Sequence, residues 1–259
     1  MRKYGGAVIH RDRDQHGWIE VVDTFGVRSL HFGTPSRQSA MSLVEPERLE
    51  LPYVRAMLTG LLFRPDPGPV LLLGLGGGSL ARFLLRHFPD CRIEAVESRA
   101  RVVELARRFF QLPEDPRLTV HVADGRDFVC ARAEGDTAVY GQILVDAYDQ
   151  AGLAPQVQGH EFFAAAVKLL QGDGVLAINL WGSDHPALRQ GLALLDCYCQ
   201  RRTLRLPVFG RGNVIGFGFG AALAWPGREL LERRARALER RLGIEFPRLL
   251  RACCVPQRR

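Results

Sequence analysis

The sequence predicts an α/β fold with a mostly parallel sheet, preceded by a small β segment and closed by an antiparallel hairpin. Short apolar strands alternate with helical segments between residues 70 and 200, which is typical of a parallel sheet covered by helices on both faces. Two strand-like runs near the N-terminus flank a tight turn. Two more runs near residue 210 are joined by only five residues.

The N-terminal segment is predicted to be rich in β structure. Residues 18–22 and 27–32 form the strands of a hairpin with its turn at residues 23–26. A two-stranded hairpin is marginal in water, so it must pack on a larger body. Residues 50–63 then place their apolar side chains at helical spacing, which predicts an amphipathic helix.

The central segment alternates between the two periodicities. The predicted strands are residues 70–73, 92–96, 118–122, 140–145 and 175–180, and the predicted helices are residues 80–88, 100–110, a short helix from 126, 160–170 and 186–200. Residues 203–208 and 214–219 form two last strands. Their connection is too short for a parallel crossover, which needs about a dozen residues or more, so they are antiparallel.

A parallel sheet that ends in one reversed hairpin is the Rossmann-like architecture of methyltransferases that use S-adenosylmethionine (AdoMet). The chain is accordingly divided into three parts. We expect an N-terminal β-hairpin segment at 1–48, an AdoMet-type nucleoside-binding α/β domain at 49–225, and a basic C-terminal helix and tail at 226–259.

The formal net charge is +7, and part of the excess is a run of arginines beyond residue 228. This run is consistent with a nucleic-acid patch or with the solvated face of a helix. No aromatic residues interleave the arginines, as a single-strand binder would require, so we favour the solvated face and expect no nucleic-acid partner.

No run of about 18 apolar residues is present, and the first residues lack the apolar segment of a signal peptide, so we expect no membrane partner. The six cysteines form no C-x-x-C pair and have no spaced histidines after them. We therefore expect no metal site, no disulfide framework, and a reducing cytoplasmic location.

A glycine-rich loop follows the first buried strand and opens a helix, the context that a nucleoside-binding loop requires. Its candidate binding residues are Gly74, Gly76, Gly77, Gly78 and Ser79. The nicotinamide fingerprint would place a glycine at position 79, so the spacing fits AdoMet-type loops better. The alternative is an ordinary turn between a strand and a helix.

Two further candidates end the next two strands. An acid at the position of Glu97 accepts hydrogen bonds from ribose hydroxyls in nucleoside-binding sheets. Asp124, followed by Gly125, can accept a hydrogen bond from the adenine amino group. Each acid also has a structural alternative, because Glu97 precedes a helix and Asp124 is a good helix N-cap.

Two acids follow the fourth strand, at Asp146 and Asp149. Ligands of open α/β sheets bind at the carboxyl ends of the strands, near the switch in strand order. Acids directly after the apolar run 143–145 are costly unless they have a function. The alternative is a turn whose acids are solvated.

The order of these features resembles the spermidine synthase family over roughly residues 15–220. The resemblance implies that Glu97 binds ribose and Asp124 binds adenine. It implies that Asp146 takes a proton from the attacking amine and that Asp149 helps to hold this amine. It further implies a small-molecule amine acceptor and a homodimer formed through the N-terminal β segment.

The sequence also departs from the family pattern. Tyr53 matches the tyrosine of the family's Y-Q-E-M segment, but Val54 replaces the glutamine after it. Ser79 replaces the acid that pairs with the amine of decarboxylated AdoMet, and Gln150 follows Asp149 where the family has proline. Loss of an acid at position 79 weakens the preference for decarboxylated AdoMet and tolerates AdoMet, whose carboxylate an acid would repel.

The function expected from the sequence is aminopropyl transfer from decarboxylated AdoMet to a polyamine acceptor such as putrescine, with Asp146 as the base. Ser79 motivates a first alternative, an AdoMet-dependent methyltransferase on the same fold. Val54 motivates a second alternative, a nucleoside-binding module that has lost catalysis.

Overall fold

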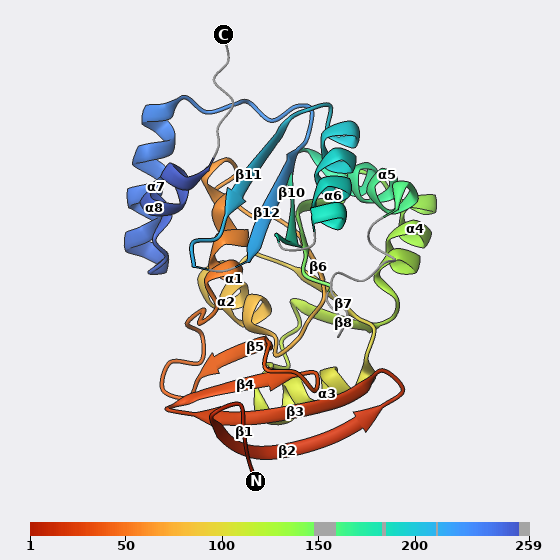
Figure 1. The fold of residues 1–259 in the computed structure, drawn as a ribbon. Coiled ribbons are helices and arrows are strands. Elements are labelled where there is room, and N and C mark those ends of the chain that lie inside the picture. Colours follow the sequence, from red (N-terminus) through yellow and green to blue (C-terminus); the bar gives the residue numbers. More distant parts are fainter. Residues whose placement is uncertain (148–158, 183–184, 211, 254–259) are drawn as a thin grey trace.

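The computed structural model describes residues 1–147, 159–182, 185–210 and 212–253. Two sheets organise the chain, a five-stranded N-terminal sheet and a seven-stranded central sheet with helices on both faces (Figure 1). The α/β fold predicted from the sequence is confirmed, including its reversed hairpin. Among the described residues, no helix is long and apolar enough to cross a bilayer.

The central sheet has the strand order β11-β12-β10-β9-β6-β7-β8. Its strands are β6 (Val70–Leu73), β7 (Ile93–Glu97), β8 (Leu118–Val122), β9 (Tyr140–Val145), β10 (Leu170–Trp181), β11 (Thr203–Pro207) and β12 (Asn213–Phe219). The five strands from β6 to β10 are mutually parallel, whereas β12 is antiparallel to both β10 and β11. The chain runs outward from β6 through β7 to β8 and then returns to the other side of β6 with β9. The switch in strand order therefore lies between β6 and β9.

Helices cover the central sheet on both faces (Figure 1). They are α1 (Pro52–Met57), the 3-10 helix η1 (Leu58–Leu62), α2 (Ser79–His87), α3 (Ala100–Phe109), α4 (Gly125–Gly135), α5 (His160–Leu169), α6 (His185–Tyr198), α7 (Arg228–Leu242) and α8 (Phe246–Ala252). One buried apolar cluster joins the sheet to α1, η1, α2, α7 and α8, and a second joins it to α4, α5 and α6. Burial on both sides explains why the central strands have almost continuous apolar sequences.

The N-terminal sheet is larger than the predicted hairpin. It contains β1 (Arg2–Lys3), β2 (Gly6–Asp14), β3 (Gly17–Thr24), β4 (Val27–His31) and β5 (Arg37–Ser42), paired in this order. Apart from its first residue, β2 alternates between partly buried and exposed side chains and carries many charges, so it lacks the apolar signal of a strand. Its pairing with β3 identifies it as a strand, and this pairing is a tertiary property.

The N-terminal sheet packs against α3 through a third apolar cluster. A partly buried ion pair reinforces this contact: the Arg99 guanidinium lies 2.9 and 2.7 Å from the two carboxylate oxygens of Asp14 and also donates to the Gly17 carbonyl oxygen. Arg99 lies two residues after Glu97. The N-terminal sheet therefore packs directly beside one of the predicted site residues.

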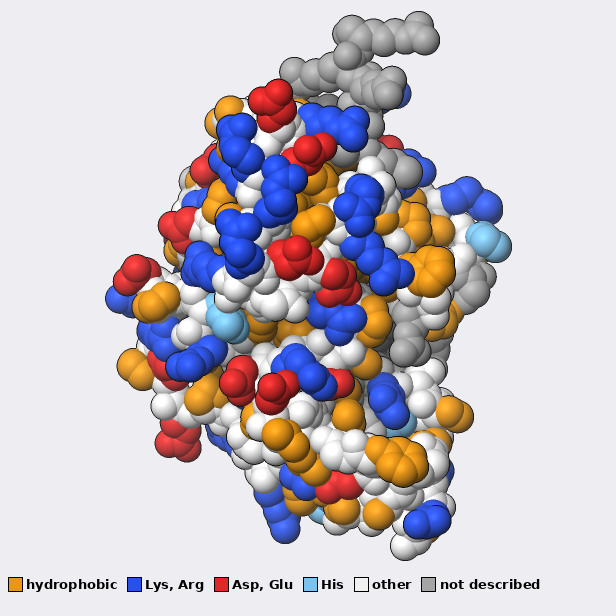
Figure 2. Space-filling view, turned by 90° about the vertical axis from the view of Figure 1, so that its left-hand side faces the viewer, with side chains coloured by type: hydrophobic (Ala, Val, Ile, Leu, Met, Phe, Trp, Pro, Cys, Tyr) orange, Lys and Arg blue, Asp and Glu red, His pale blue; other side chains and the backbone are white. Residues whose placement is uncertain are grey.

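The C-terminal helices α7 and α8 pack beside η1 and bury Leu231, Leu238 and Leu242 of α7. Arg234 of α7 donates hydrogen bonds to the Leu62 and Phe63 carbonyl oxygens, at 2.9 and 3.1 Å. Figure 2 shows basic side chains gathered on the outer face of this helix pair. The arginine run of the sequence thus belongs to an amphipathic helix with a buried leucine face, as the sequence predicts.

Arg82 of α2 is predicted to stabilise the glycine loop through its buried side chain. Its side chain is 8% exposed and donates to the carbonyl oxygens of Gly77 and Phe110 at 2.6 and 2.5 Å. Arg82→Met leaves these buried acceptors without that donor and should lower the free energy of unfolding by about 1–3 kcal/mol in urea titrations. Arg86→Met, at an exposed position of the same helix, is the control and should change it by less than about 0.5 kcal/mol. Equal stabilities of the two variants would contradict this role of Arg82.

Candidate active site

The predicted site residues gather at the carboxyl edge of the central sheet. Gly74 follows β6, Glu97 ends β7, Asp124 follows β8 and Asp146 follows β9. These four strands are adjacent and parallel, so their carboxyl ends open on the same edge. The position between β6 and β9 is the switch point at which open α/β sheets bind ligands.

Gly74 joins the two sides of this switch point. Its φ angle is +95°, and a Cβ atom there would lie 2.2 Å from the Asp146 carbonyl oxygen. The Asp146 amide in turn donates to the Leu73 carbonyl oxygen at 2.7 Å. Only glycine permits both this conformation and this approach. The first glycine of the loop is therefore required by the backbone of the acid loop that follows β9.

Glu97 holds the glycine loop through its carboxylate. One oxygen accepts from the Leu75 and Gly76 amides at 3.1 and 3.4 Å, and the other accepts from the Arg99 amide at 3.1 Å. Burial raises the pKa of Glu97, while the three backbone donors oppose the rise. Ribose binding by Glu97 remains a prediction. The structure assigns it a second task that the sequence did not suggest, the positioning of the loop.

Asp124 is the N-cap of α4, which begins at Gly125. One of its carboxylate oxygens accepts from the amides of Arg126 and Asp127, at 2.9 and 3.2 Å. The structural alternative considered for this residue is thus correct. Adenine recognition by Asp124 stays a prediction, and it requires the oxygen that does not cap the helix.

Asp146 is the acid that follows β9 at this edge. The Asn179 side-chain amide donates to its Oδ1 at 2.8 Å, and the Tyr53 hydroxyl is a second hydrogen-bond partner. Burial raises the pKa of Asp146 to about 6, and the negative charge of Glu97 adds to the rise. The two hydrogen bonds oppose it because they favour the ionised carboxylate. Tyr53 and Asp146, two of the predicted site residues, are therefore in contact.

Two asparagines near Asp146 were missed in the sequence. Asn179 is 2% exposed on β10, and its Oδ1 accepts from the Nδ2 of Asn213, which is 7% exposed at the start of β12. The Nδ2–Oδ1 distance is 3.0 Å. The available signal was Asn179 itself, an amide within the apolar run of a buried strand, where a polar side chain needs a partner.

Ser79 and Asp149 are the two remaining predicted site residues with polar side chains. Ser79, the first residue of α2, points its hydroxyl at β5, where it donates to the Ala40 carbonyl oxygen at 3.2 Å and lies 3.2 Å from the Ser39 hydroxyl. Position 79 is therefore in contact with the N-terminal sheet. Asp149 lies outside the described residues, so its predicted role in holding the amine stays a prediction.

Comparison with known proteins identifies the family. The model of the spermine/spermidine synthase domain matches residues 53–192, more than half of the chain. The chain is 36% identical over 230 residues to a polyamine aminopropyltransferase of Chromobacterium violaceum, a match that covers 88% of this chain and 86% of that protein. The chain belongs to the spermine/spermidine synthase family. The resemblance drawn from the sequence is confirmed, and so is the prediction of a transferase enzyme.

Solved structures share the fold of this chain. A probable spermidine synthase from Corynebacterium glutamicum superimposes with a TM-score of 0.74 at 24% identity, over 90% of this chain and 88% of that one. Human methyltransferase-like protein 13 in complex with SAH gives a TM-score of 0.68 at 29% identity, over 74% of this chain and 93% of that one. This member of the spermine/spermidine synthase family thus shares its fold with both aminopropyl- and methyltransferase-type proteins.

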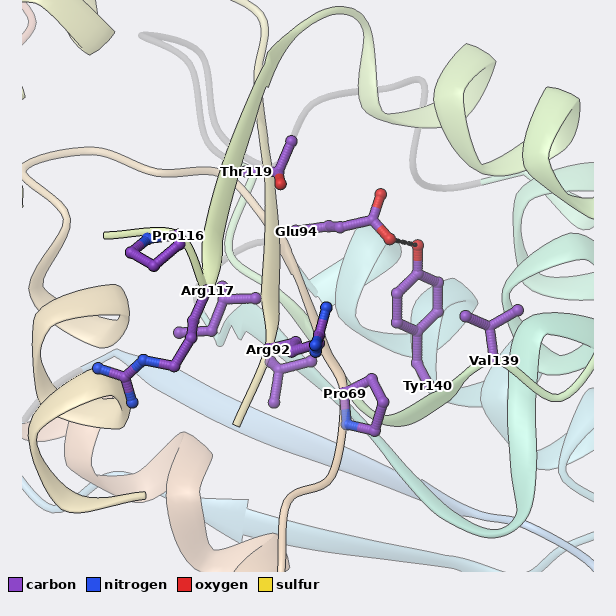
Figure 3. A pocket seen from close by; sticks show the side chains of 10 residues that line it. Pro69, Arg92, Glu94, Pro116, Arg117, Thr119, Val139 and Tyr140 are labelled. Carbon is purple, nitrogen blue, oxygen red and sulfur yellow. Dashed lines mark hydrogen bonds between the residues drawn. The ribbon is translucent and has the colours of Figure 1, made fainter. Parts of the chain in front are cut away.

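A separate hollow lies at the opposite edge of the sheet, where β6, β7, β8 and β9 begin (Figure 3). It encloses about 290 Å³ and contains the carboxylate of Glu94. This carboxylate accepts from the Tyr140 hydroxyl at 3.1 Å and is paired with His121 and Arg132 at 3.2 and 3.4 Å. The hydrogen-bond donors to the Glu94 carboxylate come from the protein itself, and the hollow lies at the opposite edge of the sheet from Asp146. We therefore do not assign the active site to this hollow.

The raised pKa of Asp146 predicts a pH-dependent effect on stability. Its pKa of about 6 in the folded protein exceeds the value of about 3.9 for an unfolded aspartate, so protonation favours the folded state. The contribution of Asp146 to stability should then decline as pH rises from about 4 to about 6 and stay low above that range.

Asp146→Asn removes this titration and should stabilise the enzyme at pH 8 by up to about 3 kcal/mol, with almost no effect at pH 3. Urea unfolding of both proteins across this pH range measures the difference. A difference that does not vary with pH would show that Asp146 is not perturbed by burial.

Proposed function

We propose that this enzyme transfers an aminopropyl group from decarboxylated AdoMet to a small polyamine acceptor such as putrescine, with Asp146 as the base. The observation that carries this proposal is the placement of Asp146. It is a desolvated carboxylate at the switch point of a nucleoside-binding sheet, hydrogen-bonded by Tyr53 and Asn179. The polyamine aminopropyltransferase relative from Chromobacterium violaceum supports the same reaction.

The reaction requires a neutral amine. An amine with a pKa near 10.4 costs about 4.6 kcal/mol to deprotonate at pH 7. In the transfer, the amine nitrogen attacks the methylene carbon next to the sulfonium, the C–S bond breaks, and its electron pair neutralises the sulfur. The amine proton passes to Asp146. A carboxylate with a pKa of about 6 is ionised at neutral pH and is a stronger base than an ordinary aspartate, so burial improves its match to this task.

The remaining edge residues are proposed to bind the nucleoside. Glu97, at the end of β7 beside β6, would accept from the ribose hydroxyls, and Asp124, which follows the next strand β8, would accept from the adenine amino group. The glycine loop between β6 and α2 would lie against the nucleoside tail. The SAH complex of human methyltransferase-like protein 13 supports an AdoMet-type ligand on this fold. Asp149 would hold the acceptor amine.

Methyl transfer from intact AdoMet is the second candidate. Two observations favour it, the serine at position 79 and the 29% identity to human methyltransferase-like protein 13. The acceptor could then be an amine that needs no strong base. Product analysis by mass spectrometry separates the two reactions, since an aminopropyl group and a methyl group add different masses to the acceptor.

Asp146→Asn tests the proposed base. Asparagine keeps the size and a hydrogen-bond acceptor for Asn179, but it cannot take a proton from an ammonium. We expect the rate of aminopropyl transfer to putrescine to fall by about 10²- to 10⁴-fold. Nucleoside affinity, measured by calorimetry, should stay within a few-fold. As a control, Asp127→Asn alters an exposed acid in the first turn of α4 and should leave the rate unchanged. Equal turnover of wild type and Asp146→Asn would remove this residue from catalysis.

Ser79→Asp tests which nucleoside the site prefers. An added carboxylate attracts the amine of decarboxylated AdoMet and repels the carboxylate of AdoMet. It is also repelled by the Ala40 carbonyl oxygen that the serine hydroxyl now contacts, which favours its rotation toward the loop. The ratio of the two dissociation constants should shift toward decarboxylated AdoMet by about tenfold. Ser79→Asn is the uncharged control and should shift it little. A shift in the other direction would place the nucleoside tail away from this loop.

A further inference from the structure

A chain of side-chain amides connects the reversed hairpin to Asp146. Asn213 Nδ2 donates to Asn179 Oδ1 at 3.0 Å, and Asn179 Nδ2 donates to Asp146 Oδ1 at 2.8 Å. The three residues belong to three neighbouring strands or their ends, since β12 pairs with β10 and β10 pairs with β9. Both asparagines are buried, at 2% and 7% exposure.

The register of the hairpin makes this contact possible. Ile215 lies directly opposite Asn179, and Asn213 lies opposite Trp181. Asn213 is thus two residues from the direct partner of Asn179, and residues in this diagonal relation share one face of a sheet. Burial of two amides in the interior is unfavourable unless they are hydrogen-bonded. Each of them is satisfied in part by the other.

The direction of the hydrogen bonds determines what Asn179 presents to the carboxylate. An asparagine side chain has a donor end and an acceptor end, and it can turn over to exchange them. Turned over, Asn179 would place its carbonyl oxygen against the Asp146 carboxylate and its NH₂ group against the NH₂ group of Asn213. The donor from Asn213 therefore favours the orientation in which Asn179 donates to Asp146.

We propose that Asn213 is a positioning residue for the transfer reaction, which acts by orienting Asn179 so that its amide donates to Asp146. The inference rests on the proposed role of Asp146 as the base. Asn179 and Tyr53 both hydrogen-bond to the Asp146 carboxylate, and Asn179 does so at Oδ1. Among the described residues, hydrogen bonds link Asn213 to Asp146 through Asn179, so its effect on the reaction passes through Asn179.

The charged surroundings decide the direction of the effect. Among the described residues, the ionisable groups that act on the Asp146 carboxylate are Glu97, whose charge raises its pKa, and Tyr53, whose hydrogen bond lowers it. The Asn179 amide also lowers it. Loss of a well-directed amide donor should therefore raise the pKa of Asp146 and move the acid limb of the rate profile to higher pH.

Asn213→Ala is the first test variant. We expect the acid limb of kcat for aminopropyl transfer to rise by about one pH unit, which lowers the rate about fivefold at pH 6 and little at pH 9. Asn213→Asp keeps the size of the side chain but replaces the donor by a carboxylate, so it should raise the limb further. If the Asn213→Ala variant does not fold, the Asn213→Asp variant provides the test. Val214→Ala shortens the next side chain of the same strand, which points to the other face, and is the matched control.

A double-mutant cycle separates positioning from a purely structural role. In the Asp146→Asn background, Asn213→Ala should no longer change the residual rate, because its effect requires the carboxylate. Rates that fall by the same factor in both backgrounds would overturn the proposal. So would an acid limb that stays in place in both Asn213 variants.

The carboxylate signal of Asp146 provides a readout that does not need turnover. In ¹³C NMR spectra of the protein alone, the pKa of Asp146 should rise by about one unit in Asn213→Ala. If the pKa of Asp146 shifts in Asn213→Ala but the wild type shows no aminopropyl transfer, the amide chain is supported and the proposed function is wrong. If the wild type transfers the aminopropyl group but the pKa of Asp146 does not shift in Asn213→Ala, the function is supported and the role of Asn213 is wrong.

Discussion

The site at the carboxyl edge of the central sheet depends on one backbone junction, where the end of β6 meets the end of β9. The Asp146 amide donates to the Leu73 carbonyl oxygen, and the Asp146 carbonyl oxygen occupies the space that a side chain at Gly74 would need. The glycine loop and the acid loop are therefore held against each other at the switch point. The proposed nucleoside and the proposed amine would react across this junction, and a shift of about 1 Å in such a geometry lowers rates severely.

Two desolvated carboxylates border the junction, and each is stabilised by donors of a different kind. The Glu97 carboxylate accepts from the Leu75 and Gly76 amides of the glycine loop and from the Arg99 amide. Asp146 accepts from the side chains of Tyr53 and Asn179, which come from α1 and β10. Backbone amides are fixed in position, so they suit Glu97, which positions the glycine loop. With its side-chain donors, Asp146 keeps a pKa of about 6, which suits a residue that must exchange a proton. The same raised pKa lowers the stability of the folded protein when Asp146 is ionised.

Elements outside the parallel core support both carboxylates. The N-terminal sheet reaches the proposed nucleoside site through Asp14, whose pair with Arg99 lies beside Glu97, and through β5, which contacts Ser79. The reversed hairpin reaches the proposed amine site through Asn213. The two β additions to the Rossmann-like sheet thus stand on opposite sides of the junction. Each of them contributes contacts that the parallel strands alone do not provide.

The sequence by itself determined the order of strands and helices between residues 70 and 219, the antiparallel end of the sheet and the positions of the four polar strand ends. These follow from periodicity, connection length and the geometry of parallel strands, which are local or topological properties. Only the tertiary structure decided that β1, β2 and β5 are strands of one sheet and that Ser79 faces β5. It also decided that Asn179 and Asn213, 34 residues apart, meet beside Asp146. Their contact depends on the register between β10 and β12 and on burial, and neither quantity is encoded in the spacing of residues along the chain.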